Sequence, residues 1–181
     1  MFFDKYILPL SAKSITLNVF IMEKGTIKAL KIVCYVVLVG VILWVAFYAM
    51  QSYFVLTTGS GHGVINWGSP RMGLKLTWFV VNRITLLLMA GLMGAFVFNI
   101  LKYLSGGTIF NHANVVLLWI MAIILPIHSF ISDNMGIACS ASEHFDLVLT
   151  DSPFVYAVMA LLVALLYQLA YRAAEEQKLT I

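Results

Sequence analysis

The residues that decide the fold run from Leu101 to Ile131, LKYLSGGTIFNHANVVLLWIMAIILPIHSFI. One apolar run ends here, the chain turns at Ser105-Gly106-Gly107, and a second apolar run follows. Glycine leaves a helix easily through positive φ, and an asparagine side chain can accept a hydrogen bond from the amides that open a helix. The stretch therefore predicts a helical hairpin with its turn in water, whose second helix starts at Asn111 or Asn114.

The composition requires lipid as the solvent for most of the chain. Of 181 residues, 62% are hydrophobic and only 10% are charged, and the mean hydropathy is +0.96. A soluble domain of this size has no core large enough for so many apolar side chains. A membrane helix needs about 20 apolar residues to cross about 30 Å of hydrocarbon. Runs of this kind are expected at about Ile32 to Phe54, Val80 to Tyr103, Val115 to Ile131 and Phe154 to Tyr171.

These runs predict an all-α membrane protein with four transmembrane helices in an antiparallel bundle. They are too long and too evenly apolar for barrel strands, which alternate over about ten residues. Three parts are expected: an N-terminal segment (1–26), the transmembrane domain (27–174) and a short tail (175–181). The first segment is expected to lie on the inner leaflet or to be an extension before a natural start at Met22.

The basic residues predict that both termini are cytoplasmic. With the N-terminus inside, eight Lys and Arg residues fall in inner segments and three in outer ones, which agrees with the positive-inside rule. The inner residues are Lys5, Lys13, Lys24, Lys28, Lys31, Lys102, Arg172 and Lys178, and the outer ones are Arg71, Lys75 and Arg83. We therefore expect a multi-pass protein of a bacterial cytoplasmic (inner) membrane.

Arg83 lies within the second apolar run and is the most informative single residue. A cation at this depth must extend to the membrane surface or find a partner. A structural tether to an acid of the second outer loop, Asp133 or Asp151, is the favoured interpretation, and contact with an anionic ligand is the alternative.

His128 follows Pro126 near the outer end of the third run. Proline removes one intrahelical hydrogen bond and leaves a carbonyl without its donor. A neutral, hydrogen-bonded histidine is favoured over a proton sensor or a metal ligand.

The second outer loop gathers acidic and imidazole side chains, at Glu143, His144, Asp146 and Asp151. Their oxygens and nitrogens would suffice for a divalent cation. Since no pair has the spacing of a known metal motif, we predict no metal and no cofactor. The two cysteines, Cys34 and Cys139, fall on opposite sides of the membrane in this topology, so no disulfide is expected.

Small residues line two of the predicted helices. Ala90, Gly91, Gly94 and Ala95 form overlapping small-xxx-small pairs, and the last run carries an alanine stripe at Ala157, Ala160 and Ala164. Such faces let helices approach closely. They predict packing within the chain or between copies in a homo-oligomer.

Two motifs resemble a bacterial family of four-helix membrane proteins that is known as a domain of unknown function. The first is the turn from Gly107 to Val115, with Gly107, Phe110 and Asn114, and the second is the tail from Glu175 and Glu176 to Leu179-Thr180-Ile181. Members are often encoded beside a small helix-turn-helix regulator of the Xre/Cro type, so the resemblance implies a cytoplasmic partner of that kind. Where the family often has basic residues after the asparagine, this chain has VLLW at 116–119, and direct contact with nucleic acid is not expected.

Three classes of function remain, of which signalling or regulation is favoured. In that interpretation the outer loops sense a signal and the inner turn and tail contact the soluble regulator. The alternative is a small transporter or a ligand-binding membrane component with a site between helices near Arg83 and His128. An enzyme is not expected, because the sequence has no paired intramembrane carboxylates, no nucleophile motif and no Cys-x-x-Cys.

Overall fold

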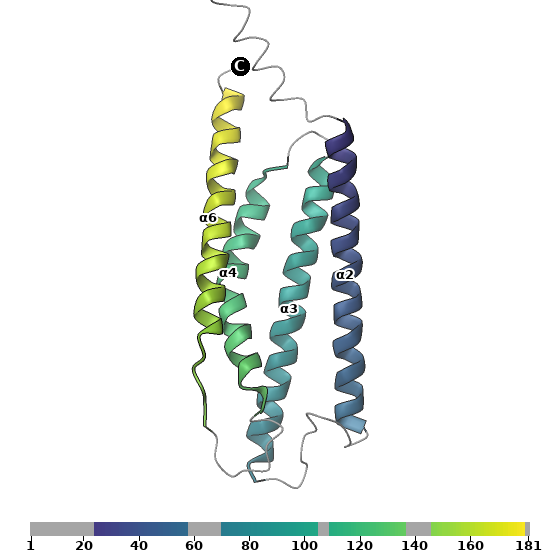
Figure 1. Cartoon of the computed structure of the whole chain (residues 1–181), viewed down its shortest axis with the longest axis vertical. Coiled ribbons are helices and arrows are strands. Elements are labelled where there is room, and N and C mark those ends of the chain that lie inside the picture. Colours follow the sequence, from purple (N-terminus) through teal and green to yellow (C-terminus); the bar gives the residue numbers. More distant parts are fainter. Residues whose placement is uncertain (1–23, 58–69, 105–108, 137–145, 180–181) are drawn as a thin grey trace, which may run out of the picture.

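Four α-helices make up most of the described chain (Figure 1). The computed structural model describes residues 24–57, 70–104, 109–136 and 146–179. The helices are α2 (Lys24–Thr57), α3 (Met72–Leu104), α4 (His112–Asp133) and α6 (Ser152–Leu179). No strand occurs in these ranges. Each predicted apolar run lies within one helix, so the all-helical prediction is confirmed for the part of the chain that the structure describes.

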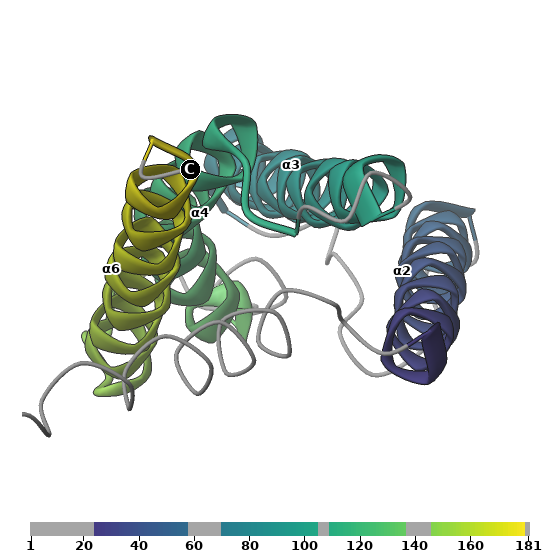
Figure 2. The ribbon, with the colours of Figure 1, turned by 90° about the horizontal axis from the view of Figure 1, so that it is seen from above.

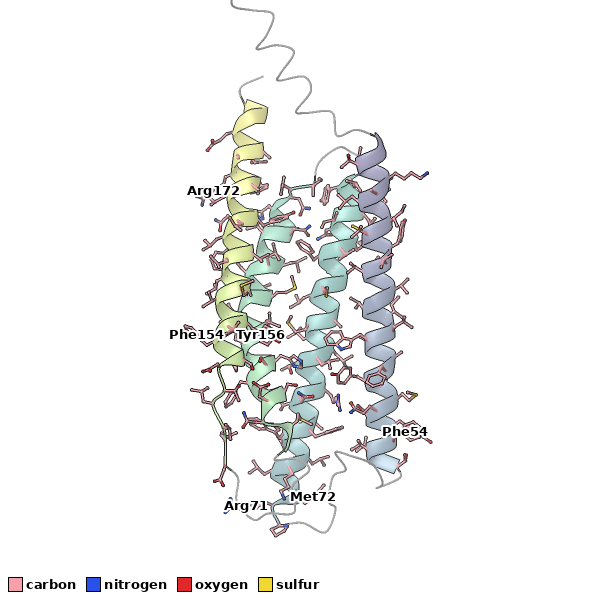
Figure 3. The ribbon with its side chains drawn as sticks, viewed as in Figure 1. Phe54, Arg71, Met72, Phe154, Tyr156 and Arg172 are labelled. Carbon is pink, nitrogen blue, oxygen red and sulfur yellow. The ribbon has the colours of Figure 1, made fainter. Side chains whose placement is uncertain are left out.

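All four helices are long and apolar enough to cross a membrane. Even the shortest, the 22-residue α4, is about 33 Å long at 1.5 Å per residue, and a hydrocarbon layer is about 30 Å thick. Many large apolar side chains are exposed on the outer surface of the molecule. Phe54 and Phe154, for example, lie on its two opposite flanks (Figure 3). Such surfaces are costly in water and favourable in lipid. The chain is therefore a multi-pass membrane protein.

All four helices begin before their predicted apolar runs, and the difference is largest for α2 and α3. α2 begins at Lys24 and α3 at Met72, before the predicted Ile32 and Val80. An apolar run marks the part of a helix that lies in hydrocarbon, whereas lysine and other good helix formers extend the helix beyond it.

Most of the expected N-terminal segment (1–26) and the start at Met22 lie outside the described residues. Of the expected tail (175–181), residues 175–179 belong to α6, which ends at Leu179.

The helices form a curved row rather than a closed bundle. Close contacts join α2 to α3, α3 to α4 and α4 to α6, and none joins α2 to α4 or α6 among the described residues. Viewed along the helices, α2 and α6 are the two ends of the row (Figure 2). The colours in Figure 1 show that the chain reverses direction between successive helices. We call the end that holds Thr57, Met72 and Asp133 the lower end, and the end that holds Leu104 and His112 the upper end.

Alanines rather than glycines are buried between the helices. Ala90 of α3, Ala122 of α4 and Ala164 of α6 are buried. A Cβ built on Gly91 or Gly94 meets no atom within 4 Å, so these two glycines contact no neighbouring helix in the described chain.

The start of α4 is fixed by a side-chain cap. Asn111 has extended backbone angles, and its side chain accepts a hydrogen bond of 2.8 Å from the Asn114 amide. This bond satisfies one of the amides that every helix N-terminus leaves free. The prediction that α4 starts at Asn111 or Asn114 is confirmed, with Asn111 as the cap.

Candidate functional site

Arg83 of α3 faces α2 near the lower end. Its Nη2 donates a hydrogen bond of 3.1 Å to Oε1 of Gln51. Its guanidinium carbon lies 5.1 Å from the ring centroid of Tyr48 and 4.8 Å from that of Phe79. Cation–π contacts at these distances are favourable, and more so away from water. These three partners are uncharged, and none of them is Asp133 or Asp151, the acids predicted to tether Arg83.

An open polar cavity of about 460 Å³ lies beside Arg83, where α2, α3 and the lower end of α4 meet. Polar groups line it from all three helices. The lining residues are Tyr48, Gln51 and Val55 of α2, Phe79, Asn82 and Arg83 of α3, and Ser132, Met135 and Gly136 at and after the end of α4. Guanidinium, amide and hydroxyl groups all donate hydrogen bonds. The wall of the cavity is therefore suited to an acceptor with negative charge.

Asn82 is the residue of this cavity that the sequence analysis missed. Its side chain is only 3% exposed, yet its Nδ2 has no hydrogen-bond partner among the described residues. A buried donor without a partner costs about 1–3 kcal/mol, so such a group calls for an explanation. The only sequence signal was an amide next to an arginine inside an apolar run.

A second, apolar cavity of about 360 Å³ shares Tyr48, Phe79 and Arg83 with the first. It lies between α2 and α3. Its other lining residues are Val45, Ala49, Ser52 and Leu56 of α2 and Val80, Ile84, Leu86 and Leu87 of α3. Arg83 thus lies where a polar and an apolar cavity adjoin.

His128 lies near this site but lines neither cavity. Its Nδ1 is 2.9 Å from Oγ1 of Thr85, and that hydroxyl donates to the Asn82 carbonyl at 3.0 Å. Because the hydroxyl proton is used for that bond, the Thr85 oxygen accepts and His128 Nδ1 donates. The hydrogen bonds link α4 to the turn of α3 that carries Asn82.

Asn134 fixes the wall of the polar cavity that α4 supplies. Its Nδ2 donates to the carbonyls of Phe130 and Val148, each at 2.9 Å, and its Oδ1 accepts from the Val148 amide at 2.7 Å. A further bond, from Thr150 to Asp133, joins the same two segments. The residues that follow Asn134, Met135 and Gly136, are therefore held against the cavity.

Asp146, the described member of the predicted loop set of Glu143, His144 and Asp146, does not line this cavity. Glu143 and His144 lie outside the described residues, and Asp146 is exposed. In the part of the chain that the structure describes, no three His, Cys, Asp or Glu side chains are grouped to hold a metal ion.

The residues of the family-like turn pack the upper end together. Asn114 is fully buried, and its Nδ2 donates to the Phe96 carbonyl at 3.4 Å. Phe110 lies edge-on to Tyr167, with ring centroids 5.3 Å apart. Asn114 thus presents no surface to a soluble partner. Gly107 lies outside the described residues.

Glu175 and Glu176 are exposed, in contrast to the turn. Tyr171 contacts His112, the first residue of α4, with ring centroids 6.1 Å apart. The part of α6 that follows Tyr171, with both glutamates, therefore extends beyond α4, as Figure 1 shows.

Comparison with models of known protein families gives no match, and comparison with curated proteins and with solved structures gives none either.

Proposed function

We propose that this protein binds a small anion, a carboxylate or a phosphate group, in the polar cavity between α2, α3 and the end of α4. The observation that carries the proposal is the buried amide of Asn82. Asn82 lines the cavity together with Arg83, and its buried Nδ2 has no hydrogen-bond partner among the described residues. This is the alternative of the sequence analysis, a ligand-binding component near Arg83, with His128 in a supporting position.

The chemistry of the cavity selects an anion over a cation or an apolar molecule. Arg83 carries a fixed positive charge, and hydrogen bonds between a cation and an anion are about twice as strong as neutral ones. Asn82 adds a donor that is already desolvated, so an acceptor placed there recovers the free energy that burial has cost. The Tyr48 and Phe79 rings hold the guanidinium in place. The Arg83 side chain therefore loses less conformational entropy when a ligand binds.

The proposed orientation places this cavity on the outside of a bacterial cytoplasmic membrane. It is supported by the excess of Lys and Arg in the segments that connect at the upper end. The helices then form an antiparallel transmembrane assembly with both termini in the cytoplasm, and a ligand reaches the cavity from the lower, outer end.

The proposed role of ligand binding is signalling. The exposed glutamates Glu175 and Glu176, on the part of α6 that extends beyond α4, support a cytoplasmic contact with a basic surface, such as that of a helix-turn-helix regulator. Transport is the second candidate, and the open cavity near Arg83 supports it equally.

Anion binding is tested by thermal unfolding in a neutral maltoside detergent, with inorganic phosphate titrated at constant ionic strength. A ligand that binds only the folded state stabilises it by about 2.7 kcal/mol at 100 times its Kd. We expect saturable stabilisation of the wild type and of the control Arg71→Gln, which removes an exposed arginine at the same end. The effect should be lost in Arg83→Gln and in Asn82→Leu.

Asn82→Leu decides the outcome, because it keeps the volume of the side chain and removes a buried donor that lacks a partner. It should fold at least as stably as the wild type. Equal stabilisation of wild type and Asn82→Leu by phosphate, or none in either, would refute anion binding in this cavity.

The signalling role is tested with the glutamates. A helix-turn-helix protein that copurifies from native membranes with the wild type should be lost from the double variant Glu175→Gln, Glu176→Gln, which retains helix-forming side chains. If the helix-turn-helix protein copurifies equally with the wild type and the double variant, the two glutamates do not form the contact.

A further inference from the structure

We infer that the anion is the headgroup of an anionic phospholipid, one of whose acyl chains lies in the apolar cavity between α2 and α3. This inference rests on the proposed function and names the class of ligand. It starts from the fact that the two cavities share Tyr48, Phe79 and Arg83. A molecule with a charged end and an apolar end matches this pair of adjoining surfaces.

The depth of Arg83 favours a lipid over a dissolved anion. α3 has 33 residues, from Met72 to Leu104, so Arg83 precedes its midpoint by about 7–8 Å at 1.5 Å per residue. Side chains of a helix tilt toward its N-terminus, which for α3 is the lower end. With the hydrocarbon centred on α3, the guanidinium lies close to the boundary of a layer about 30 Å thick. Lipid headgroups and the ester region begin at this boundary, whereas a free anion must lose its water to reach it.

The apolar cavity is open on a surface that faces lipid. Of its α3 residues, Ile84 is 58% and Leu87 is 56% exposed. Both residues belong to a membrane-spanning helix, so the medium outside them is hydrocarbon. An acyl chain can enter the cavity sideways from the bilayer without crossing water.

The polar cavity supplies the selectivity for a negative headgroup. Arg83 and Asn82 line it, together with Ser132 from the end of α4. A zwitterionic headgroup such as phosphocholine brings a quaternary ammonium close to Arg83, where like charges repel. The cavity should therefore prefer phosphatidylglycerol to phosphatidylcholine.

The test uses the full chain in neutral maltoside detergent, with dioleoyl phosphatidylglycerol or dioleoyl phosphatidylcholine added, and counts retained lipid by native mass spectrometry. Ala49→Phe fills the apolar cavity, since Ala49 lines only that one. Val163→Phe adds the same side chain at an exposed position of α6 away from both cavities and is the control. Thermal unfolding of each variant establishes that it is folded.

We expect the wild type and Val163→Phe to retain one phosphatidylglycerol at least tenfold more tightly than phosphatidylcholine. Ala49→Phe should lose this lipid at least tenfold while keeping the stabilisation by inorganic phosphate. Asn82→Leu should lose both effects. These results together would establish the lipid as the ligand.

Two outcomes overturn the inference, and they differ in what they say of the proposed function. If phosphate stabilises the wild type but not Asn82→Leu, and lipid retention is the same for both lipids or is unchanged by Ala49→Phe, the site binds a soluble anion and no lipid. If phosphate has no effect on the wild type and retention of phosphatidylglycerol is unchanged in Asn82→Leu, both proposals are refuted.

Discussion

Asn134 is predicted to contribute more to stability than any other single polar side chain at the lower end. Its side chain is 3% exposed and makes three hydrogen bonds of 2.7–2.9 Å, to the Phe130 carbonyl and to both backbone groups of Val148. The substitution Asn134→Ala removes all three. It also releases the segment before α6 from the end of α4, beside the residues that line the polar cavity.

The expected loss follows from these contacts. A hydrogen bond contributes a net 0.5–1.5 kcal/mol, so three contribute about 1.5–4.5 kcal/mol. The side chain of Val148 is exposed, so water can replace the lost partner of its backbone groups, and the loss falls in the lower half of that range. We expect Asn134→Ala to lower the free energy of unfolding by about 2 kcal/mol, a factor of about 30 in the folding equilibrium.

The assay is unfolding in mixed micelles of maltoside and dodecyl sulfate, followed by far-ultraviolet circular dichroism. Thr150→Val is the matched control, because it removes the exposed hydrogen bond between Thr150 and Asp133 that joins the same segments. An exposed bond of this kind should cost only a few tenths of a kcal/mol. A loss below about 0.5 kcal/mol for Asn134→Ala, or a loss equal to that of Thr150→Val, would show that the Asn134 side chain does not hold the segment.

Three further predictions concern other parts of the chain. Asn111→Ala removes the cap of α4 and should cost about 1 kcal/mol of unfolding free energy, whereas Asn111→Asp keeps an acceptor and should restore most of it; equal losses would contradict the capping role. A double-mutant cycle of Thr85→Val and His128→Leu should give a coupling energy of about 1 kcal/mol, and additive losses would show that the bond between the two is not formed. In intact cells Cys139 should react with a membrane-impermeant maleimide, while Cys34, which is buried, should not; reaction of Cys139 only after the membrane is permeabilised would invert the proposed orientation.

The sequence predicts the helices well because membrane helices obey a simple rule. A run of about 20 apolar residues must be helical in lipid, where every backbone group needs an internal partner. The start of α4 was also predictable from the sequence, since Asn111 follows a glycine turn and precedes an apolar run. Helix ends were predicted less accurately, because α2 and α3 continue through residues such as Lys28 and Lys75 that hydropathy excludes.

The order of contacts between helices could not be predicted from the sequence. Each of these helices carries apolar side chains on all of its faces, so no apolar stripe in the sequence marks the face that packs against a neighbouring helix. Gly91 and Gly94 had the pattern of a packing motif, yet they contact no other described helix. Lys75 was assigned only to an outer segment, and no pattern predicted that it would be buried, at 2% exposed.

Of the candidate site, the sequence predicted Arg83 but not the residues that surround it. A cation inside an apolar run is rare, so Arg83 was recognisable as a special residue from the sequence alone. Its neighbours Gln51 and Ser132 come from positions far apart in the chain, and only the arrangement of α2, α3 and α4 brings them together. Asn82 was missed because its importance depends on the lack of a partner, which no sequence pattern records.

The attachment of α2 by one side has a mechanical consequence. Its close contacts within the described chain are with α3 alone, whereas α6 is tied to the rest of the molecule by hydrogen bonds from Tyr167 to Ile109 and from Trp119 to Gln168. A force applied at the N-terminus therefore has to rupture only the contact between α2 and α3, in which Arg83 donates one hydrogen bond to Gln51. Pulling with an atomic-force cantilever from that terminus should extract α2 as a separate first step, at a lower force than α6 requires when it is pulled from the C-terminus.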